Sequence, residues 1–166
     1  MQCIKTATGN CIHIDIIMSD MYENIGKNTW DHIYIQDNSI LDIECPYLND
    51  FTLLMHSAFN MRNDLVEWLI KMDVNVNIQR SIENRGFRKC NTALMSACYH
   101  GSPQSINALV NAGAKILLKD SKGETALEKA LYNATGERDE CIDAILDCIK
   151  EKSKNYEAYL LDNIIF

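Results

Sequence analysis

The sequence predicts a mostly α-helical solenoid of three repeated helix pairs, with a small β-containing cap at its N-terminus. Three observations lead to this fold class. A six-residue motif recurs along the chain, signals for helix starts and ends recur with it, and the first 50 residues instead alternate apolar and polar side chains. The 166 residues include only 2 prolines and 7 glycines, which is few for an all-β chain that needs many tight turns.

The first 50 residues carry the two-residue period of β-strands. Ile12, Ile14 and Ile16 alternate with more polar neighbours, and a second alternating run extends from Trp30 to Ile35. A terminal repeat leaves one apolar side open unless another segment covers it. We therefore expect residues 1–50 to form a β-rich N-terminal cap.

The internal repeat begins at residues 52–57, 92–97 and 125–130. The second and third copies both read Thr-Ala-Leu-x-x-Ala, and the step from the first copy to the second is longer than the step from the second to the third. The apolar positions downstream of the first two copies stay in register. The seven extra residues must therefore lie between positions 77 and 92.

The second copy shows how each repeat becomes a pair of helices. Thr92 precedes a short first helix, which is expected to end at Gly101 because glycine readily adopts a positive φ. Ser102 is a typical N-cap, Pro103 suits the first helical position, and Gly113 ends the second helix. The predicted units are three repeats over residues 51–77, 91–120 and 124–152, an inserted finger over 78–90, and a C-terminal capping helix over 153–166.

From Thr92 to Leu127 the chain reads Thr-Ala-Leu-Met-x-Ala, then Gly-x-x-x-x-Ile-x-x-Leu-Val-x-Ala-Gly-Ala, then Asp-x-x-Gly-x-Thr-Ala-Leu. This pattern closely resembles the ankyrin-repeat family. The first repeat departs from it, because Met61 and Asp73 stand where the pattern has glycine. The resemblance covers about 100 of the 166 residues and implies a rigid, non-enzymatic scaffold that binds another protein.

The resemblance also implies that the finger is a usual place for partner contacts. Here the finger is lengthened and basic, with four cationic side chains against Glu83 alone. Arginine and aromatic residues contribute disproportionately to binding energy at protein interfaces. The residues expected to contact a partner are Arg80, Arg85, Phe87, Arg88, Lys89, Trp68, Tyr99 and His100. The alternatives are a solvated finger, packing between repeats for Trp68, and a structural hydrogen bond for His100.

No catalytic residue, cofactor site or metal site is predicted. The sequence contains no Ser/His/Asp order, no phosphate-binding glycine loop and no zinc-helix motif. Cys3, Cys11 and His13 lie close together, but no Cys-x-x-Cys pair is present to complete a tetrahedral zinc site.

Charge and cysteine content restrict the partner and the compartment. The net charge of −7 argues against a nucleic-acid partner, and no apolar run reaches the roughly 18 residues of a membrane span. Residues 1–50 carry a net charge of −6, so a protein partner is expected to be basic. Seven cysteines, an odd number, without a signal segment indicate a reduced, cytoplasmic protein, which we expect to be monomeric when free.

These observations together predict a protein that binds its partner stoichiometrically. An inhibitor or immunity-type protein that neutralises a toxin or an enzyme is the first expectation. A viral or bacterial effector or adaptor that docks on a host protein, in the host cytosol, is the alternative. An enzyme that uses residues 1–50 is a remote third class.

Overall fold

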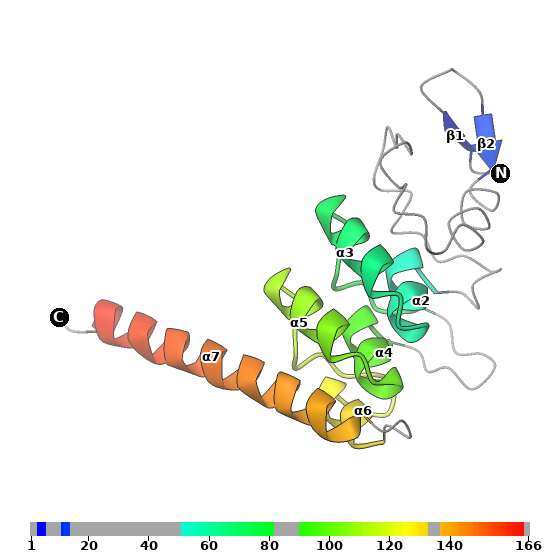
Figure 1. Cartoon of the computed structure of the whole chain (residues 1–166). Coiled ribbons are helices and arrows are strands. Elements are labelled where there is room, and N and C mark those ends of the chain that lie inside the picture. The colour runs from blue at the N-terminus through cyan, green and yellow to red at the C-terminus, as the bar shows by residue number, and fades with distance from the viewer. Residues whose placement is uncertain (1–2, 6–10, 14–50, 82–89, 133–136, 165–166) are drawn as a thin grey trace.

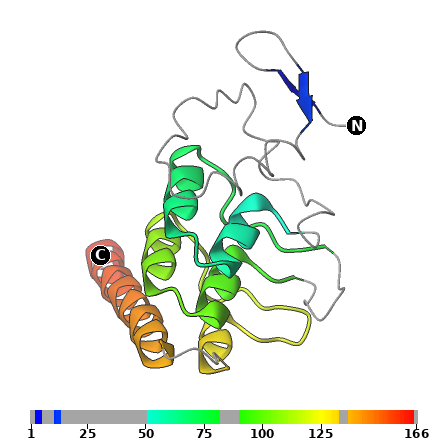
Figure 2. The ribbon, with the colours of Figure 1, turned by 45° about the vertical axis from the view of Figure 1, so that its right-hand side comes forward.

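The computed structural model describes residues 3–5, 11–13, 51–81, 90–132 and 137–164. Its helices are α2 (Leu53–Phe59), α3 (Asn63–Lys71), α4 (Ala93–His100), α5 (Pro103–Asn111), α6 (Ala126–Leu131) and α7 (Arg138–Ile164). They form two rows, which Figures 1 and 2 show from different sides. In the first row α4 packs between α2 and α6, and in the second row α5 packs between α3 and α7. The predicted helical solenoid of three helix pairs is confirmed.

A short antiparallel hairpin lies near the N-terminus. Strand β1 (Cys3–Lys5) pairs with β2 (Cys11–His13), with Ile4 opposite Ile12. The other residues of the range 1–50 lie outside the described part of the chain. The β-rich cap that the sequence predicts over residues 1–50 therefore stays a prediction.

Threonine and serine side chains cap the N-termini of α2, α4, α5 and α6. The Thr52 and Thr92 hydroxyls each accept a hydrogen bond from the backbone N–H three residues ahead, at 3.2 Å. Ser102 does the same for α5, with Pro103 at the first helical position. Thr125 and Glu128 form a reciprocal capping box at α6. The caps satisfy backbone donors that would otherwise lack a partner.

Three turns keep the same left-handed backbone conformation in successive repeats, whether or not the residue is glycine. The φ angle is 55° at Met61 and 82° at its equivalent Gly101. It is 58° at Asp73 and 91° at Gly113, and 62° at Cys90 and 80° at Gly123. Residues with a Cβ atom adopt this conformation only at an energetic cost of roughly 1–2 kcal/mol. The packing of the repeats, rather than the local residue, therefore fixes these turns.

The base of the inserted finger is closed by a backbone hydrogen bond. Arg80 N–H donates to the Asn91 carbonyl at 2.9 Å, and Asp120 N–H donates to the Glu124 carbonyl at the same distance in the next finger. The first bond encloses residues 81–90 and the second only residues 121–123. The seven surplus residues therefore lie inside the first finger, as the spacing predicts.

One apolar core runs through all three helix pairs. Its largest fully buried side chains include Phe51, Leu53, Met55, Leu65, Leu69, Leu94, Met95, Ile106, Leu109 and Ile145. Small residues such as Ala58, Ala97 and Ala130 lie on the first-row helices, where neighbouring helices approach. In the described residues, no helix combines the length and the apolar character that crossing a membrane requires.

The C-terminal part differs from the sequence prediction. The predicted boundary between a third repeat ending at 152 and a separate helix over 153–166 is wrong, because α7 is one continuous helix of 27 residues. No proline or glycine occurs between Arg138 and Ile164, so nothing in the sequence interrupts the helix. The last part of α7 extends past the stacked helix pairs (Figure 1).

Candidate functional site

Aromatic residues recur at the C-terminal ends of the first-row helices. Phe59, Tyr99 and Tyr132 occupy the same place in the three repeats, counted from the threonine that caps each helix. Because α4 packs against both α2 and α6, the three positions follow one another across the stack. Tyr99 and Tyr132 are 47% and 60% exposed, and Phe59 is half-buried. We call these three residues the aromatic ladder.

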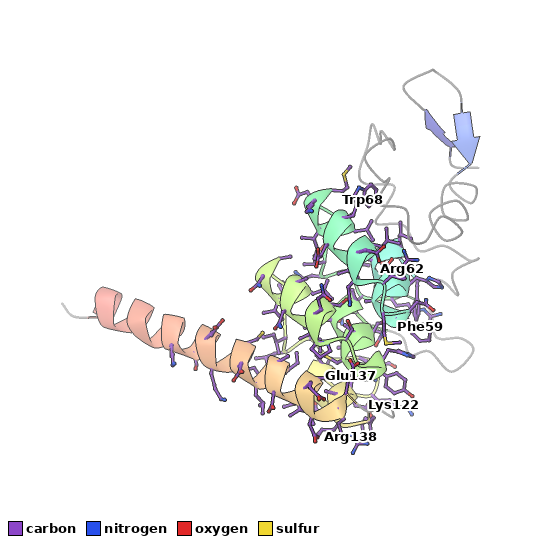
Figure 3. All side chains as sticks on the ribbon, in the orientation of Figure 1. Phe59, Arg62, Trp68, Lys122, Glu137 and Arg138 are labelled. Atoms are coloured by element: carbon purple, nitrogen blue, oxygen red, sulfur yellow. The ribbon has the colours of Figure 1, made fainter. Side chains whose placement is uncertain are left out.

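His100 connects the first two positions of the ladder. Its ring centroid lies 3.8 Å from that of Phe59 and 5.0 Å from that of Tyr99. Phe59 in turn packs against the buried ring of Phe51, at 5.7 Å. This chain of rings ties the end of α2, labelled at Phe59 in Figure 3, to the end of α4. The ladder is therefore supported by the core at its first-repeat end.

Both histidines of the first row are neutral at physiological pH. Burial lowers the pKa of His56 from 6.5 to about 4. Burial also lowers the pKa of His100, whose Nε2 is buried without a hydrogen-bond partner among the described residues. The structural hydrogen bond expected for His100 is thus not made at Nε2, because the ring instead packs on Phe59.

Two of the three helices that carry the ladder contain no residue that is charged at neutral pH. Helices α2 and α4 contain no acidic residue, lysine or arginine. In α6, Lys129 is buried and Glu128 takes part in the capping box. Met61 and Leu131, next to the ladder positions in the sequence, are also about half exposed.

The one buried ionic cluster that the described residues show lies at the second finger. Lys129 Nζ lies 2.5 Å from a carboxylate oxygen of Asp120 and 2.8 Å from one of Glu124. Burial alone would raise the pKa of Asp120, but hydrogen bonds from Lys129 and from the N–H groups of Glu124 and Lys122 hold it below 3.8. Every charge in the cluster has a partner, so its role is to fasten the finger to α6.

The described cysteines and acidic residues do not form a reactive site. Within the described residues, Cys90, Cys98, Cys141 and Cys148 form no disulfide bond. Burial, together with the nearby Cys141 and Cys148, raises the pKa of the Cys98 thiol well above its usual range, so the thiol stays protonated and unreactive. Within the described ranges, no three His, Cys, Asp or Glu side chains come together as metal ligands.

Arg80 corrects the predicted contact set. The sequence places it at the exposed finger, but its side chain is fully buried and its guanidinium carbon lies 5.0 Å from the centroid of the Phe51 ring. The reason is its place in the repeat, because Arg80 occupies the position of Asp120, which is also buried. Arg80 is therefore not available to a partner in this structure.

The other predicted contact residues fall into three groups. Tyr99 and His100 lie together at the ladder. Trp68 lies apart from them on α3 in the second row, half-buried and packed against the core, as Figure 3 shows. Arg85, Phe87, Arg88 and Lys89 lie outside the described residues. The sequence prediction missed Tyr132, although its place in the third repeat, equivalent to that of Tyr99 in the second, identifies it.

Comparison with known proteins agrees with this architecture. The family model for ankyrin repeats (3 copies) matches residues 54–157, more than half of the chain. Ankyrin repeat and SAM domain-containing protein 6 of Rattus norvegicus is 34% identical over 77 residues, which are 46% of this chain and 8% of that protein. The human ASB11 ankyrin repeat domain is 25% identical, with a TM-score of 0.48 over 59% of this chain and 40% of its own. The chain thus spans less than half of either relative.

The family match covers the three helix pairs, the finger between the first two pairs and much of α7. Ankyrin repeats form a protein-protein interaction fold that is generally non-enzymatic. The chain belongs to the ankyrin-repeat family.

Proposed function

We propose that the protein binds one protein partner stoichiometrically through the aromatic ladder and thereby neutralises it, as an inhibitor or immunity-type protein does. The observation that carries this proposal is the exposure of Tyr99 and Tyr132 at equivalent ends of packed helices. Tyrosine is enriched among the residues that dominate binding energy at protein interfaces. The two rings supply large contact areas in a surface that holds no catalytic cluster among its described residues.

Preorganisation supports the same conclusion. The ladder residues sit on or next to the first-row helices, of which α2 and α4 are capped at their N-termini by threonine and α4 packs against a neighbour on each side. A partner therefore loses little binding energy to ordering this side of the interface. A rigid surface of this kind suits a protein that acts by occupying its partner.

The negative charge of the protein affects how fast the proposed partner associates with it. More than half of the α7 residues described as exposed are Asp or Glu, and residues 1–50 have a net charge of −6. Acidic regions of a protein attract a basic partner and raise its association rate. The proposal therefore combines a basic partner with a contact surface centred on the aromatic ladder. It also places the protein in the cytoplasm, where its free thiols stay reduced, and treats it as a monomer when free.

A photo-crosslinking amino acid placed at Tyr132 tests the contact surface directly in cells. The matched control carries the same crosslinker at Lys71, which is exposed at the end of α3 in the second row. A protein crosslinked from position 132 and not from position 71 supports the proposal. The same products from both positions, or none from position 132, would contradict it.

The crosslinked partner then distinguishes inhibition from the adaptor or effector alternative. The purified partner is titrated with the protein while its own activity is measured. Loss of activity that is complete at one equivalent supports neutralisation. Full activity in the complex shows instead that the protein docks on its partner without blocking it.

A further inference from the structure

The third repeat leaves exposed an apolar face that the first two repeats bury. Counted from the threonine that caps each first-row helix, Ala58, Cys98 and Leu131 occupy equivalent positions. Ala58 and Cys98 are fully buried, whereas Leu131 is 51% exposed. Leu94 is likewise buried, and its equivalent Leu127 is only half-buried. Burial is lost on α6 because no further first-row helix follows it in the described residues.

Helix α7 loses burial in the same way. The α5 pattern Ile-x-x-Leu-Val recurs in α7 as Ile-x-x-Ile-Leu. Ile106 and Val110 of α5 are buried, but their equivalents Ile142 and Leu146 are half-buried. Ile142 and Leu146 are four residues apart, so they lie on one face of α7, and α7 packs against α6. We call the four apolar residues of this last helix pair the end face: Leu127, Leu131, Ile142 and Leu146.

The second repeat shows which kind of element covers such a face. There α4 is covered by α6 and α5 by α7, and Cys98, in the position of Leu131, lies near Cys141 and Cys148 of α7. A repeat array that ends without a further repeat normally has a polar outer face. The last pair, α6 and α7 in Figure 1, instead keeps apolar residues at these positions. The occupant that fits the end face is therefore a helix, packed as the next helix of the stack would be.

Carboxylates flank the end face on α7. Asp139 lies three residues before Ile142, and both side chains are therefore neighbours on the helix surface. Asp143 has the same relation to Leu146. Asp139 and Asp143 are exposed, and neither forms an ion pair within the part of the chain that the structure describes. Positive side chains at the edge of an incoming helix would meet these two carboxylates.

A second copy of the chain is a poorer occupant than a basic helix. Two end faces brought together would place the carboxylates of one α7 near those of the other. Like charges brought together at an interface are unfavourable, whereas opposite charges fix the orientation of the partner. Charge complementarity therefore favours a basic element over self-association.

We propose that the end face binds an amphipathic helix of the partner protein, apolar on one side and carrying lysine or arginine at its edge, so that this helix continues the stack. This inference rests on the proposed function, because it names the element that a basic partner presents to the third repeat. Binding of an amphipathic helix by its apolar side is a common mode of peptide recognition. Tyr132 follows Leu131 directly and is 60% exposed, so the aromatic ladder and the end face adjoin.

A photo-crosslinking amino acid at Asp143 tests the inference in cells with the whole chain. Glu67 is the matched control, because it is an exposed carboxylate at the equivalent position of the first repeat. We expect position 143, and not position 67, to crosslink the protein that position 132 crosslinks. Mass spectrometry of the product identifies the crosslinked segment of that protein. A synthetic peptide of the segment should carry a net positive charge and become helical on binding, as measured by circular dichroism.

Two designed amphipathic helices of equal length test the chemistry without knowledge of the partner. Both carry leucine along one side, and the edge residues are lysine in one peptide and glutamate in the other. Each is labelled and titrated against the whole chain, with fluorescence anisotropy as the readout. We expect saturable binding of the lysine peptide, weaker binding of it at high salt, and no saturation with the glutamate peptide.

An apolar variant locates the bound peptide on the end face. Leu131→Ser together with Leu146→Ser is expected to weaken the lysine peptide about tenfold or more. Thermal melting shows whether this variant is folded. If it does not fold, the charge variants, which change only exposed side chains, still decide the question.

The charge variants separate a specific contact from general attraction to an acidic protein. Asp139→Asn together with Asp143→Asn should weaken the lysine peptide about threefold or more. Glu67→Gln together with Asp73→Asn removes the same two charges from exposed positions of the first repeat and should leave the affinity unchanged. Equal losses in the two charge variants would show that the attraction is not specific and would overturn the inference.

Equal binding of the lysine and glutamate peptides, or wild-type affinity in a folded end-face variant, would also overturn the inference. A crosslink from position 143 that joins two copies of this chain would do the same, because the occupant would then be a second copy. Crosslinking of a protein from position 132 but not from position 143 overturns this inference and leaves the proposed function in place. Failure at both positions contradicts both proposals.

Discussion

The guanidinium carbon of Arg80 lies 5.0 Å from the centroid of the Phe51 ring, and both side chains are fully buried. The contact joins the base of the inserted finger to the first residue of the first repeat. Gln79, the neighbour of Arg80, also donates hydrogen bonds from Nε2 to the carbonyls of Cys90 and Lys119. The base of the finger is thus fastened to the stack on two sides, and Arg80 is part of the core.

Replacing Arg80 should therefore affect stability before binding. Arg80→Ala removes a buried cation over an aromatic ring and leaves a cavity, so we expect the free energy of unfolding to fall by about 2–4 kcal/mol. Lys119→Ala, at an exposed position, should change it by less than about 0.5 kcal/mol. Urea denaturation followed by circular dichroism measures both. An Arg80→Ala protein as stable as the wild type would show that the side chain is not part of the core.

Because Met61 has a positive φ angle, we predict that glycine at this position makes the folded protein more stable. The Met61 side chain is 50% exposed, so Met61→Gly gives up little apolar burial and relieves the positive φ of 55°. The free energy of unfolding should rise by about 0.5–1 kcal/mol, because the relief exceeds the entropy that glycine adds to the unfolded chain.

The reciprocal substitution at Gly113 is the control for this effect. A Cβ atom added there meets no other atom within 4 Å, so Gly113→Ala should cost about 1 kcal/mol through the backbone alone. Thermal and urea unfolding measure both variants. Destabilisation by Met61→Gly would show that the methionine side chain matters more to the turn than its conformation.

Burial of His56 predicts a loss of stability under mildly acidic conditions. Its pKa is about 4 in the folded chain against 6.5 when it is unperturbed, so the unfolded state takes up a proton first as the pH falls. The contribution of His56 is fully present above pH 6.5 and is lost between pH 6.5 and about 4. His56→Gln should flatten the pH profile of unfolding in this window. An identical slope in both proteins would contradict the burial of the neutral ring.

Asp120 predicts a second loss of stability at lower pH. Its pKa lies below 3.8 in the folded chain, so the unfolded state is again protonated first. The stabilisation is present above pH 3.8 and is lost as the pH falls further through the folded pKa. Asp120→Asn should remove this part of the profile and lower stability at neutral pH, because Lys129 would lose its nearest carboxylate. Unfolding curves of both proteins below pH 3.8 measure the difference.

The helix pairs could be predicted from the sequence because their signals are local. Thr92 begins α4, Gly101 ends it, and Pro103 follows Ser102 at the start of α5. Even the size and place of the finger insertion follow from the spacing of these signals. The buried position of Arg80 could not be predicted this way, because a basic residue in a loop usually lies in solvent and Phe51 is remote in the sequence.

The length of α7 and the location of the aromatic ladder also could not be predicted from local sequence signals. The sequence prediction divided the third repeat from a capping helix at residue 152, yet polar residues without proline or glycine continue a helix as readily as they end it. Tyr132 follows Tyr99 by one repeat, but only the packing of α4 against α6 shows that the two residues belong to one surface. The exposure of both rings is the observation on which the proposed contact surface rests.

The affinity of Tyr99→Ala/Tyr132→Ala for the partner that crosslinks at position 132 tests the central claim most directly. Isothermal titration of the wild type, the double variant and Lys71→Ala gives the three dissociation constants, and thermal melting confirms that each protein is folded. The aromatic ladder predicts that the double variant binds about tenfold more weakly or worse, while Lys71→Ala binds like the wild type. Wild-type affinity in a folded double variant would contradict the claim that the ladder is the binding surface.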